Sequence, residues 1–308
     1  MKSYLLVFLT LFSVSVIAQE QNYTSQDIAI NKHIDGTLLL PNNIDKPNLA
    51  IIIAGSGPTD RDGNQNFLKN NNLKKLAIGL TNNTIATFRY DKRIVKQIRQ
   101  NNVDKDIMFD DFVTDASSVI DYFKQQDKYN KIYIVGHSQG SLVGMLAAKN
   151  KADGFISLAG AGQSIDKIII EQVEKTAPQF TEDTKRVFKI LKEGKTTTDY
   201  PLALSSIFNI DVQKFIMNWM QYSPTEILST LDLPSLIING TKDLQVSQAE
   251  AELLKEASPK AELKIIENMN HVLVTIEGDD LENSKSYNES QRPLAAELIE
   301  SIASFIEK

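Results

Sequence analysis

Short, nearly uninterrupted apolar runs alternate with segments of helical periodicity along most of this chain. A strand that is apolar at nearly every position suits a parallel sheet whose two faces are both covered by helices. The alternation therefore predicts an α/β fold with a doubly wound, mostly parallel sheet. The predicted strands are Gln26–Ile34, Gly36–Leu40, Asn48–Ala54, Thr84–Tyr90, Lys131–Val135, Gly154–Leu158, Ser235–Asn239 and Ala261–Ile266. The predicted helices are Leu73–Leu80, Phe109–Phe123, Ser138–Ala148, Thr181–Lys192, Val212–Tyr222, Ser247–Ala257 and Leu294–Ile306.

The alternation of strands and helices is interrupted once. Residues 161–233 contain helical stretches and no β-like run. We therefore expect a helical cap inserted over one end of the sheet, with the core formed by residues 19–160 and 234–308. Near the C-terminus, Asp279–Gln291 is strongly polar, and we expect a flexible loop there.

The N-terminus has the pattern of a targeting segment. Lys2 precedes a 14-residue apolar run, Tyr4–Ile17, and a polar chain follows Ala18. A membrane-spanning helix needs about 20 apolar residues, whereas a charged start, a short apolar run and small residues describe a secretory signal peptide. We expect cleavage after Ala18, which removes residues 1–18 and yields an exported protein, periplasmic or secreted. No later segment is apolar enough to suggest an integral membrane helix.

Composition narrows the available chemistry. The chain of 308 residues has no cysteine, which excludes disulfides, thiolate nucleophiles and cysteine-ligated metals. Its histidines are His33, His137 and His271. So few histidines leave little material for a histidine-rich metal site, and we expect no metal. The net charge of −6 gives no indication of a nucleic-acid partner.

Ser138 lies in the motif Gly136-His137-Ser138-Gln139-Gly140, which follows an apolar strand and opens a helix of small residues. This strand–turn–helix setting is that of a nucleophile elbow. The glycines are needed because a Cβ at either position would clash in so tight a turn. We predict that Ser138 is a nucleophile lying beside a helix N-terminus, where negative charge is favoured.

A serine hydroxyl needs a general base, and histidine is the natural one. His33 lies in the N-terminal strand pair, remote from the elbow, and His137 is fixed inside the elbow itself. His271 follows the last predicted strand on the loop that leads to the final helix. By elimination and by position, we predict that His271 is the base.

The base in turn needs an acid that fixes its tautomer. Asp243 follows the strand Ser235–Asn239 directly and should therefore lie at the same sheet edge as Ser138 and His271. The chain order Ser138, Asp243, His271 is that of the α/β-hydrolase arrangement. Asp166 and Glu267 remain alternatives for the acid.

Two backbone amides are candidates for an oxyanion hole. One is the N–H of Gln139, the residue after the nucleophile, and the other is that of Ser56 in the Gly55-Ser56-Gly57 turn. A glycine-rich turn can also bind phosphate, but the chain lacks the Gly-x-x-x-x-Gly-Lys and Gly-x-Gly-x-x-Gly patterns.

Together these residues resemble the α/β-hydrolase superfamily, and within it secreted or periplasmic bacterial esterases related to the serine aminopeptidase-like and dienelactone hydrolase-like groups. The motifs are Gly55-Ser56-Gly57-Pro58-Thr59-Asp60-Arg61-Asp62, Arg89-Tyr90-Asp91-Lys92-Arg93, Gly136-His137-Ser138-Gln139-Gly140, Gly240-Thr241-Lys242-Asp243 and Asn270-His271-Val272-Leu273. The resemblance spans about residues 48–308. It implies hydrolysis of carboxylic esters through an acyl-enzyme, with no cofactor.

The chain departs from this resemblance after Arg93. Such proteins usually continue with Gly-x-Gly, whereas this chain has Ile94-Val95-Lys96, so we expect a loop of different shape there. The charged residues around this point should brace loops. They are Arg61, Asp62, Asp91 and Arg93.

We therefore expect a serine hydrolase whose partner is a small-molecule ester. A serine peptidase or aminopeptidase of the same fold is an alternative, and an acidic pocket residue that captures a substrate amino group would favour it. A catalytically inactive binding protein is a second alternative. Acyl and alcohol specificity and the oligomeric state carry no signal in the sequence.

Apolar and aromatic residues at helical spacing occur inside the predicted cap. They are Phe215, Ile216, Trp219, Met220 and Tyr222. These side chains either pack the cap on the core or line a substrate pocket, and Phe215, Trp219 and Met220 are our candidates for substrate contact.

Overall fold

One sheet of eight strands organises the described part of the chain, residues 22–308 of a computed structural model. The predicted signal segment 1–18 lies outside the described residues. The strand order is β1-β2-β4-β3-β5-β6-β7-β8. β2 pairs antiparallel with both β1 and β4, and every other pairing is parallel, which confirms the predicted mostly parallel sheet. The strands are β1 (Tyr23–Ala29), β2 (Asp35–Pro41), β3 (Leu49–Ile53), β4 (Ala86–Tyr90), β5 (Ile132–His137), β6 (Gly154–Leu158), β7 (Ser235–Gly240) and β8 (Glu262–Ile266).

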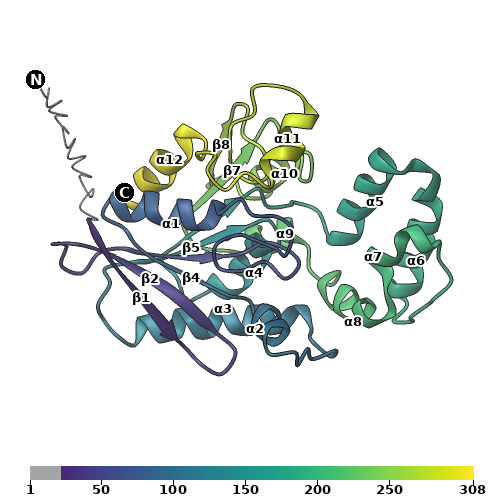
Figure 1. The fold of residues 1–308 in the computed structure, drawn as a ribbon, viewed down its shortest axis with the longest axis horizontal. Helices are drawn as coiled ribbons and strands as arrows, with labels where there is room; N and C mark the ends of the chain where they lie inside the picture. Colours follow the sequence, from purple (N-terminus) through teal and green to yellow (C-terminus); the bar gives the residue numbers. More distant parts are fainter. Residues whose placement is uncertain (1–21) are drawn as a thin grey trace, which may run out of the picture.

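Helices cover both faces of this sheet (Figure 1). On one face, α1 and α12 bury their leucines and isoleucines against the strands. On the other face, the apolar sides of α3, α4 and α10 pack on the sheet. The bounds of these helices are α1 (Asn72–Asn82), α3 (Phe109–Lys124), α4 (Gln139–Ala148), α10 (Gln248–Ala257) and α12 (Ala296–Ile306).

The parallel strands share one direction, so their carboxyl ends lie along one edge of the sheet. The Gly55 turn follows β3, the elbow follows β5, and the loops of Asp243 and His271 follow β7 and β8. Strand direction alone therefore brings these four distant segments to one edge.

Between β6 and β7 the described chain forms helices joined by turns, as residues 161–233 were expected to do. The helices are α5 (Ile165–Thr176), α6 (Thr181–Lys192), α7 (Ser205–Phe208), α8 (Ile210–Trp219) and α9 (Pro224–Ser229), with 3₁₀ turns at Pro178–Phe180 and Leu202–Leu204. α5 to α8 stand beside the sheet in Figure 1 and share an apolar cluster that includes Val187, Phe188 and Phe208. α5, α7 and α9 were not anticipated individually, although Ile165, Ile168, Ile169 and Val173 of α5 have helical spacing.

The polar stretch Asp279–Gln291 is not simply a flexible loop, and that prediction is wrong. It contains helix α11 (Asp280–Ser286). The Asp279 side chain caps this helix by accepting from the N–H groups of Leu281 and Glu282. An Asp followed three residues later by Glu is a helix-start signal that the polar composition obscured.

The segment after β4, where a loop was expected, is helical. It forms helix α2 (Arg93–Arg99). The expected bracing charges are all ion-paired: Arg61 with Asp91 at 2.9 Å, Arg89 with Asp62 at 2.9 Å, Arg99 with Asp91 at 2.6 Å, and Arg93 with Asp115 at 2.7 Å. These pairs tie the Asp62 loop and α2 to neighbouring strands and to α3.

Among residues 22–308, no helix is both long enough and apolar enough to cross a bilayer.

The Arg93–Asp115 pair gives a stability prediction. Both side chains are buried, and the guanidinium contacts both carboxylate oxygens, at 2.7 and 2.8 Å. Arg93→Met leaves the Asp115 carboxylate buried without its partner, so the free energy of unfolding should fall by about 3 kcal/mol. Urea titration measures this loss. The control is Lys185→Met, which removes an exposed pair with Glu182 and should leave the urea midpoint unchanged. Equal midpoints for both variants would refute the bracing role of Arg93.

Candidate active site

Ser138 occupies the turn between β5 and α4 with a left-handed backbone, φ 54° and ψ −122°. A non-glycine residue in such a conformation costs about 1–3 kcal/mol and is typically found at functional sites. The two flanking glycines are required sterically. A Cβ at Gly136 would lie 2.2 Å from the Gly140 oxygen, and one at Gly140 would lie 2.4 Å from the Ile53 oxygen. The turn thus exposes part of Ser138 at the carboxyl edge of the sheet.

Asp243 and His271 form a buried pair. The Nδ1 of His271 lies 2.8 Å from Oδ2 of Asp243. Because a carboxylate only accepts hydrogen bonds, Nδ1 carries the proton and Nε2 is left as the basic nitrogen. The other carboxylate oxygen, Oδ1, accepts from the N–H groups of Gln245 and Val246, at 2.8 and 2.9 Å. Asp243 is therefore fixed in the orientation that the pair requires.

The alternative acids are engaged elsewhere. Asp166 lies in the first turn of α5 and pairs with Lys192 at 2.5 Å, inside the helical segment. The Lys192 ammonium and the Ser164 hydroxyl outweigh the effect of burial and hold the pKa of Asp166 below its usual value. Glu267 accepts a hydrogen bond from Thr241 at 3.2 Å. Of the three candidate acids, Asp243 is the one that contacts His271.

Asn270 braces the loop that carries His271. Its amide nitrogen donates to Oδ1 of Asn283 and to the Ser286 hydroxyl, both at 2.8 Å. Asn283 in turn donates to the Lys242 carbonyl at 2.7 Å, beside Asp243. Helix α11 therefore connects the loops of the acid and the base. Sequence reasoning missed this connection together with the helix.

His137 contributes a second brace. Its Nε2 donates to the carbonyl oxygen of His271 at 2.8 Å, and the two rings lie 5.0 Å apart. Burial lowers the pKa of His137 to about 4, and the nearby His271 contributes to the same shift. His137 is therefore a neutral donor that joins the elbow to the base loop. His33 is half-buried near the β1–β2 turn and takes no part in these contacts.

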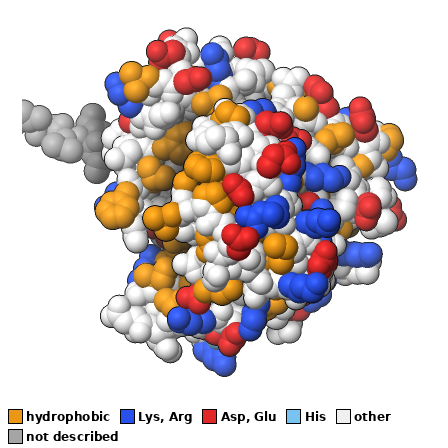
Figure 2. Space-filling model, turned by 90° about the vertical axis from the view of Figure 1, so that its right-hand side faces the viewer, with side chains coloured by type: hydrophobic (Ala, Val, Ile, Leu, Met, Phe, Trp, Pro, Cys, Tyr) orange, Lys and Arg blue, Asp and Glu red, His pale blue; other side chains and the backbone are white. Residues whose placement is uncertain are grey.

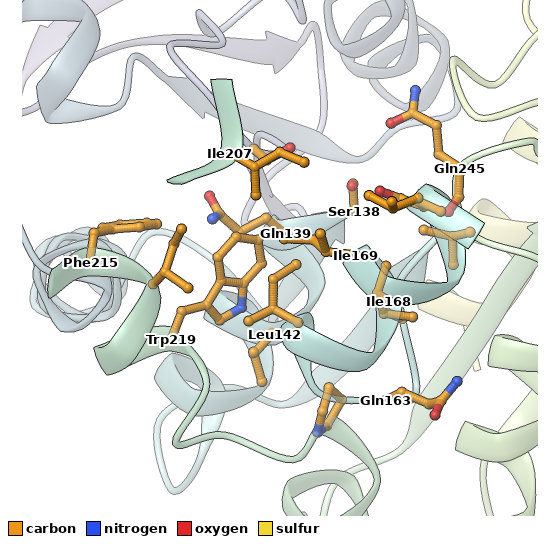
Figure 3. A pocket seen from close by; sticks show the side chains of 18 of the residues that line it. Ser138, Gln139, Leu142, Gln163, Ile168, Ile169, Ile207, Phe215, Trp219 and Gln245 are labelled. Carbon is orange, nitrogen blue, oxygen red and sulfur yellow. The ribbon is translucent and has the colours of Figure 1, made fainter. Parts of the chain in front are cut away.

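A cavity of about 490 Å³ opens in front of Ser138 (Figure 3). Ser56 and α4 line it beside Ser138. α5 and α8 form two facing walls, with Ile168 and Ile169 on one and Trp219 and Phe215 on the other. Every described residue that lines this cavity is uncharged. The polar lining consists of neutral groups, among them Gln163, Gln172 and Gln245.

Two of the three candidate substrate contacts line this cavity. Phe215 and Trp219 are four residues apart on α8, so they share one helix face and reach the same space. Met220 lies one residue further round and packs instead against the apolar cluster of α5 to α8. The cavity also contains Ser56 and Gln139, which were predicted from the elbow and turn motifs.

A smaller cavity of about 90 Å³ adjoins Ser138 on its other side. It is lined by Ser138, His137 and His271 together with polar side chains such as Asn72 and Tyr287. Ser138 and Ser56 line both cavities, so the nucleophile candidate lies where they meet.

In residues 22–308, no group of three or more His, Cys, Asp or Glu side chains is arranged to hold a metal ion. The surface seen from the side of α5 to α8 carries a band of hydrophobic side chains beside a region of mixed Lys, Arg, Asp and Glu (Figure 2).

The buried His137 predicts a pH dependence of stability. The unfolded chain binds a proton at this side chain near pH 6.5, whereas the folded protein resists protonation until about pH 4. The contribution of neutral His137 is therefore present above pH 6.5 and is lost as the pH falls through this interval. Between about pH 7.5 and 5, the wild-type free energy of unfolding should fall by about 2 kcal/mol more than that of His137→Gln. Urea titrations at both pH values measure this difference, and parallel losses in the two proteins would contradict it.

Comparison with known proteins places this geometry in a family. Residues 71–279 match the family described as serine aminopeptidase, S33. The esterase EstD of Thermotoga maritima is 25% identical over 270 residues, which are 84% of this chain and 62% of the length of that esterase. Among solved structures, Est1E from Butyrivibrio proteoclasticus superposes with a TM-score of 0.58 at 18% identity, covering 92% of this chain and 99% of its own.

Dienelactone hydrolase from Anabaena variabilis superposes with a TM-score of 0.53 at 14% identity, covering 92% of this chain and 96% of its own. At these identities the structures establish the fold, an α/β-hydrolase sheet with flanking helices. The match over residues 71–279 establishes more: the chain belongs to the serine aminopeptidase S33 family of α/β hydrolases.

Proposed function

We propose that this protein is a serine hydrolase that cleaves neutral carboxylic esters through an acyl-enzyme on Ser138. One observation carries the proposal: His271, bonded to the buried Asp243 at 2.8 Å, lines the same small cavity as Ser138, whose positive-φ turn also borders a large uncharged cavity. The similarity to the esterase EstD supports the ester as the scissile group.

The Asp243–His271 hydrogen bond supports a mechanism in which His271 is the base. Nε2 of His271 takes the proton from the Ser138 hydroxyl as the oxygen attacks the ester carbonyl. Asp243 holds His271 in the required tautomer and stabilises the imidazolium that forms. The amides of Ser56 and Gln139 donate to the oxyanion. Gln139 is suited to this role because it begins α4, where N–H groups have no partner within the helix.

The acyl group and the alcohol of the substrate occupy different cavities in this proposal. His271 must return its proton to the departing alcohol, and His271 lines the small polar cavity rather than the large one. The alcohol therefore leaves on the side of the 90 Å³ cavity, while the acyl group occupies the 490 Å³ cavity. In this reading, residues 161–233 act as a cap that supplies Phe215, Trp219 and the isoleucines of α5 as the acyl-binding wall.

The cavity lining also bears on the aminopeptidase alternative. An aminopeptidase must hold a substrate ammonium group, for which a carboxylate in the pocket is the natural partner. The described residues lining the acyl cavity include no Asp or Glu. Burying an ammonium group there without a partner is strongly unfavourable. The uncharged lining favours neutral esters over amino-acyl substrates.

Ser138→Ala tests the nucleophile. Ester turnover should fall at least ~10³-fold with the fold retained, because the acyl-enzyme can no longer form. A fluorophosphonate probe followed by peptide mapping should label Ser138 in the wild type. The matched control is Ser206→Ala, which alters another serine of the same cavity and should keep both activity and labelling. A Ser138→Ala variant that retains most of its turnover would refute the mechanism.

Substrate charge tests the ester assignment. Steady-state kinetics should compare p-nitrophenyl esters of neutral acyl chains with aminoacyl p-nitroanilides that carry a free ammonium group. We expect kcat/KM to be at least ~10²-fold lower for the aminoacyl anilides, because the acyl cavity holds no counter-charge. The N-acetylated anilides serve as controls, because they keep the scissile amide bond but lack the ammonium charge. Preference for the free-amine anilides would favour the aminopeptidase.

A further inference from the structure

Lys92 is a buried lysine next to the candidate oxyanion site. It follows β4 and is 5% exposed. Its ammonium group donates to the carbonyl oxygen of Gly55 at 2.8 Å and to the side-chain oxygen of Gln139 at 3.0 Å. It also lies 4.6 Å from the centre of the Phe112 ring. The reaction scheme above assigns it no role.

Burying this ammonium group is costly. Desolvation lowers the pKa of Lys92 to about 7, so the folded protein resists its charge. Its two acceptors are a neutral carbonyl and a neutral amide, which compensate a buried charge less well than a carboxylate does. If Lys92 only filled space, an apolar side chain of similar size could take its place without loss of stability. The segments that its ammonium group contacts therefore indicate why a lysine is found at this position.

The two acceptors belong to the segments that supply the candidate oxyanion donors. The carbonyl of Gly55 and the N–H of Ser56 are the two ends of one planar peptide unit and point in opposite directions. A hydrogen bond that holds the carbonyl on the Lys92 side therefore directs the Ser56 N–H away from Lys92. Ser56 lines both cavities that meet at Ser138.

Below its pKa of about 7, Lys92 is protonated, and its charge has a second effect on the same peptide unit. A cation bonded to a carbonyl oxygen polarises the amide and makes its N–H a stronger donor. On the other side, the bond to the Gln139 side chain fixes the first residue of α4, whose backbone N–H is the second donor. One ammonium group thus connects both donors of the site.

We propose that Lys92 is a positioning residue for the oxyanion hole: its ammonium group orients and polarises the Gly55–Ser56 peptide unit and anchors Gln139. The inference rests on the proposed function, because it assigns Lys92 a role in stabilising the oxyanion formed at Ser138. A positioning role of this kind acts on the transition state and leaves substrate binding almost unchanged.

The test uses Lys92→Met, which keeps the shape of the side chain and removes the charge and the donors. With a neutral p-nitrophenyl ester, kcat should fall ~10²-fold, the usual effect of losing one oxyanion donor, while KM stays within ~3-fold. The free energy of unfolding should stay the same or rise, because a buried charge has been removed. Lys92→Gln, which keeps an N–H donor without the charge, should lie between Lys92→Met and the wild type.

An inhibitor comparison isolates the oxyanion. A trifluoromethyl ketone adds to Ser138 and places an alkoxide in the hole, so its affinity should fall in parallel with kcat in Lys92→Met. The free carboxylic acid product forms no such adduct, and its inhibition constant should not change. The matched control is Lys75→Met, which removes a lysine of α1 that donates to the Arg292 carbonyl and lines neither cavity at Ser138, and should keep kcat within ~2-fold.

Two failures are distinguishable. If fluorophosphonate does not label Ser138 in the wild type, the proposed function fails and this inference fails with it. If the wild type is labelled and active but both Lys92 variants keep wild-type kcat and ketone affinity, the inference alone is overturned. Loss of stability in both Lys92 variants without a selective loss of ketone affinity would also overturn it, since that pattern marks a purely structural lysine.

Discussion

The turn between β5 and α4 is the constraint on which the rest of the site depends. Gly136 and Gly140 allow the strand and helix to approach so closely that Ser138 is forced to φ 54°. The same turn packs against the turn after β3. A Cβ added at Gly55 would lie only 3.2 Å from the Cβ of Ser138. One set of steric contacts thus fixes Ser138, the Gly55 turn and the start of α4.

Hydrogen bonds extend this rigidity to the other loops of the sheet edge. His137, inside the turn, holds the backbone of His271, while Asn270 reaches helix α11. Asn283 of α11 then holds the carbonyl of Lys242, next to Asp243. The side chains that make these particular bonds are all neutral.

Charge is distributed unevenly around the site. Arg–Asp pairs hold the loops after β3 and β4, whereas every described residue that lines the 490 Å³ cavity is uncharged. Lys92 is buried and bonded to Gly55 and Gln139. The proposed oxyanion site therefore has a buried lysine next to it, and the cavity proposed for the acyl group has an uncharged lining.

The sequence by itself determined the sheet and the elbow at Ser138, because both depend on local periodicity and motifs. It also determined that Asp243 and His271 lie at the same sheet edge, because that depends on strand direction. β6 was predicted with its observed bounds, Gly154–Leu158. Three features follow from the tertiary structure alone. Met220 packs in the apolar cluster of α5 to α8 and not in the 490 Å³ cavity, α11 joins the loops of Asp243 and His271, and Lys92 holds the Gly55 turn. These features arise from contacts between residues far apart in the chain. Such contacts depend on packing in three dimensions, which no short motif encodes.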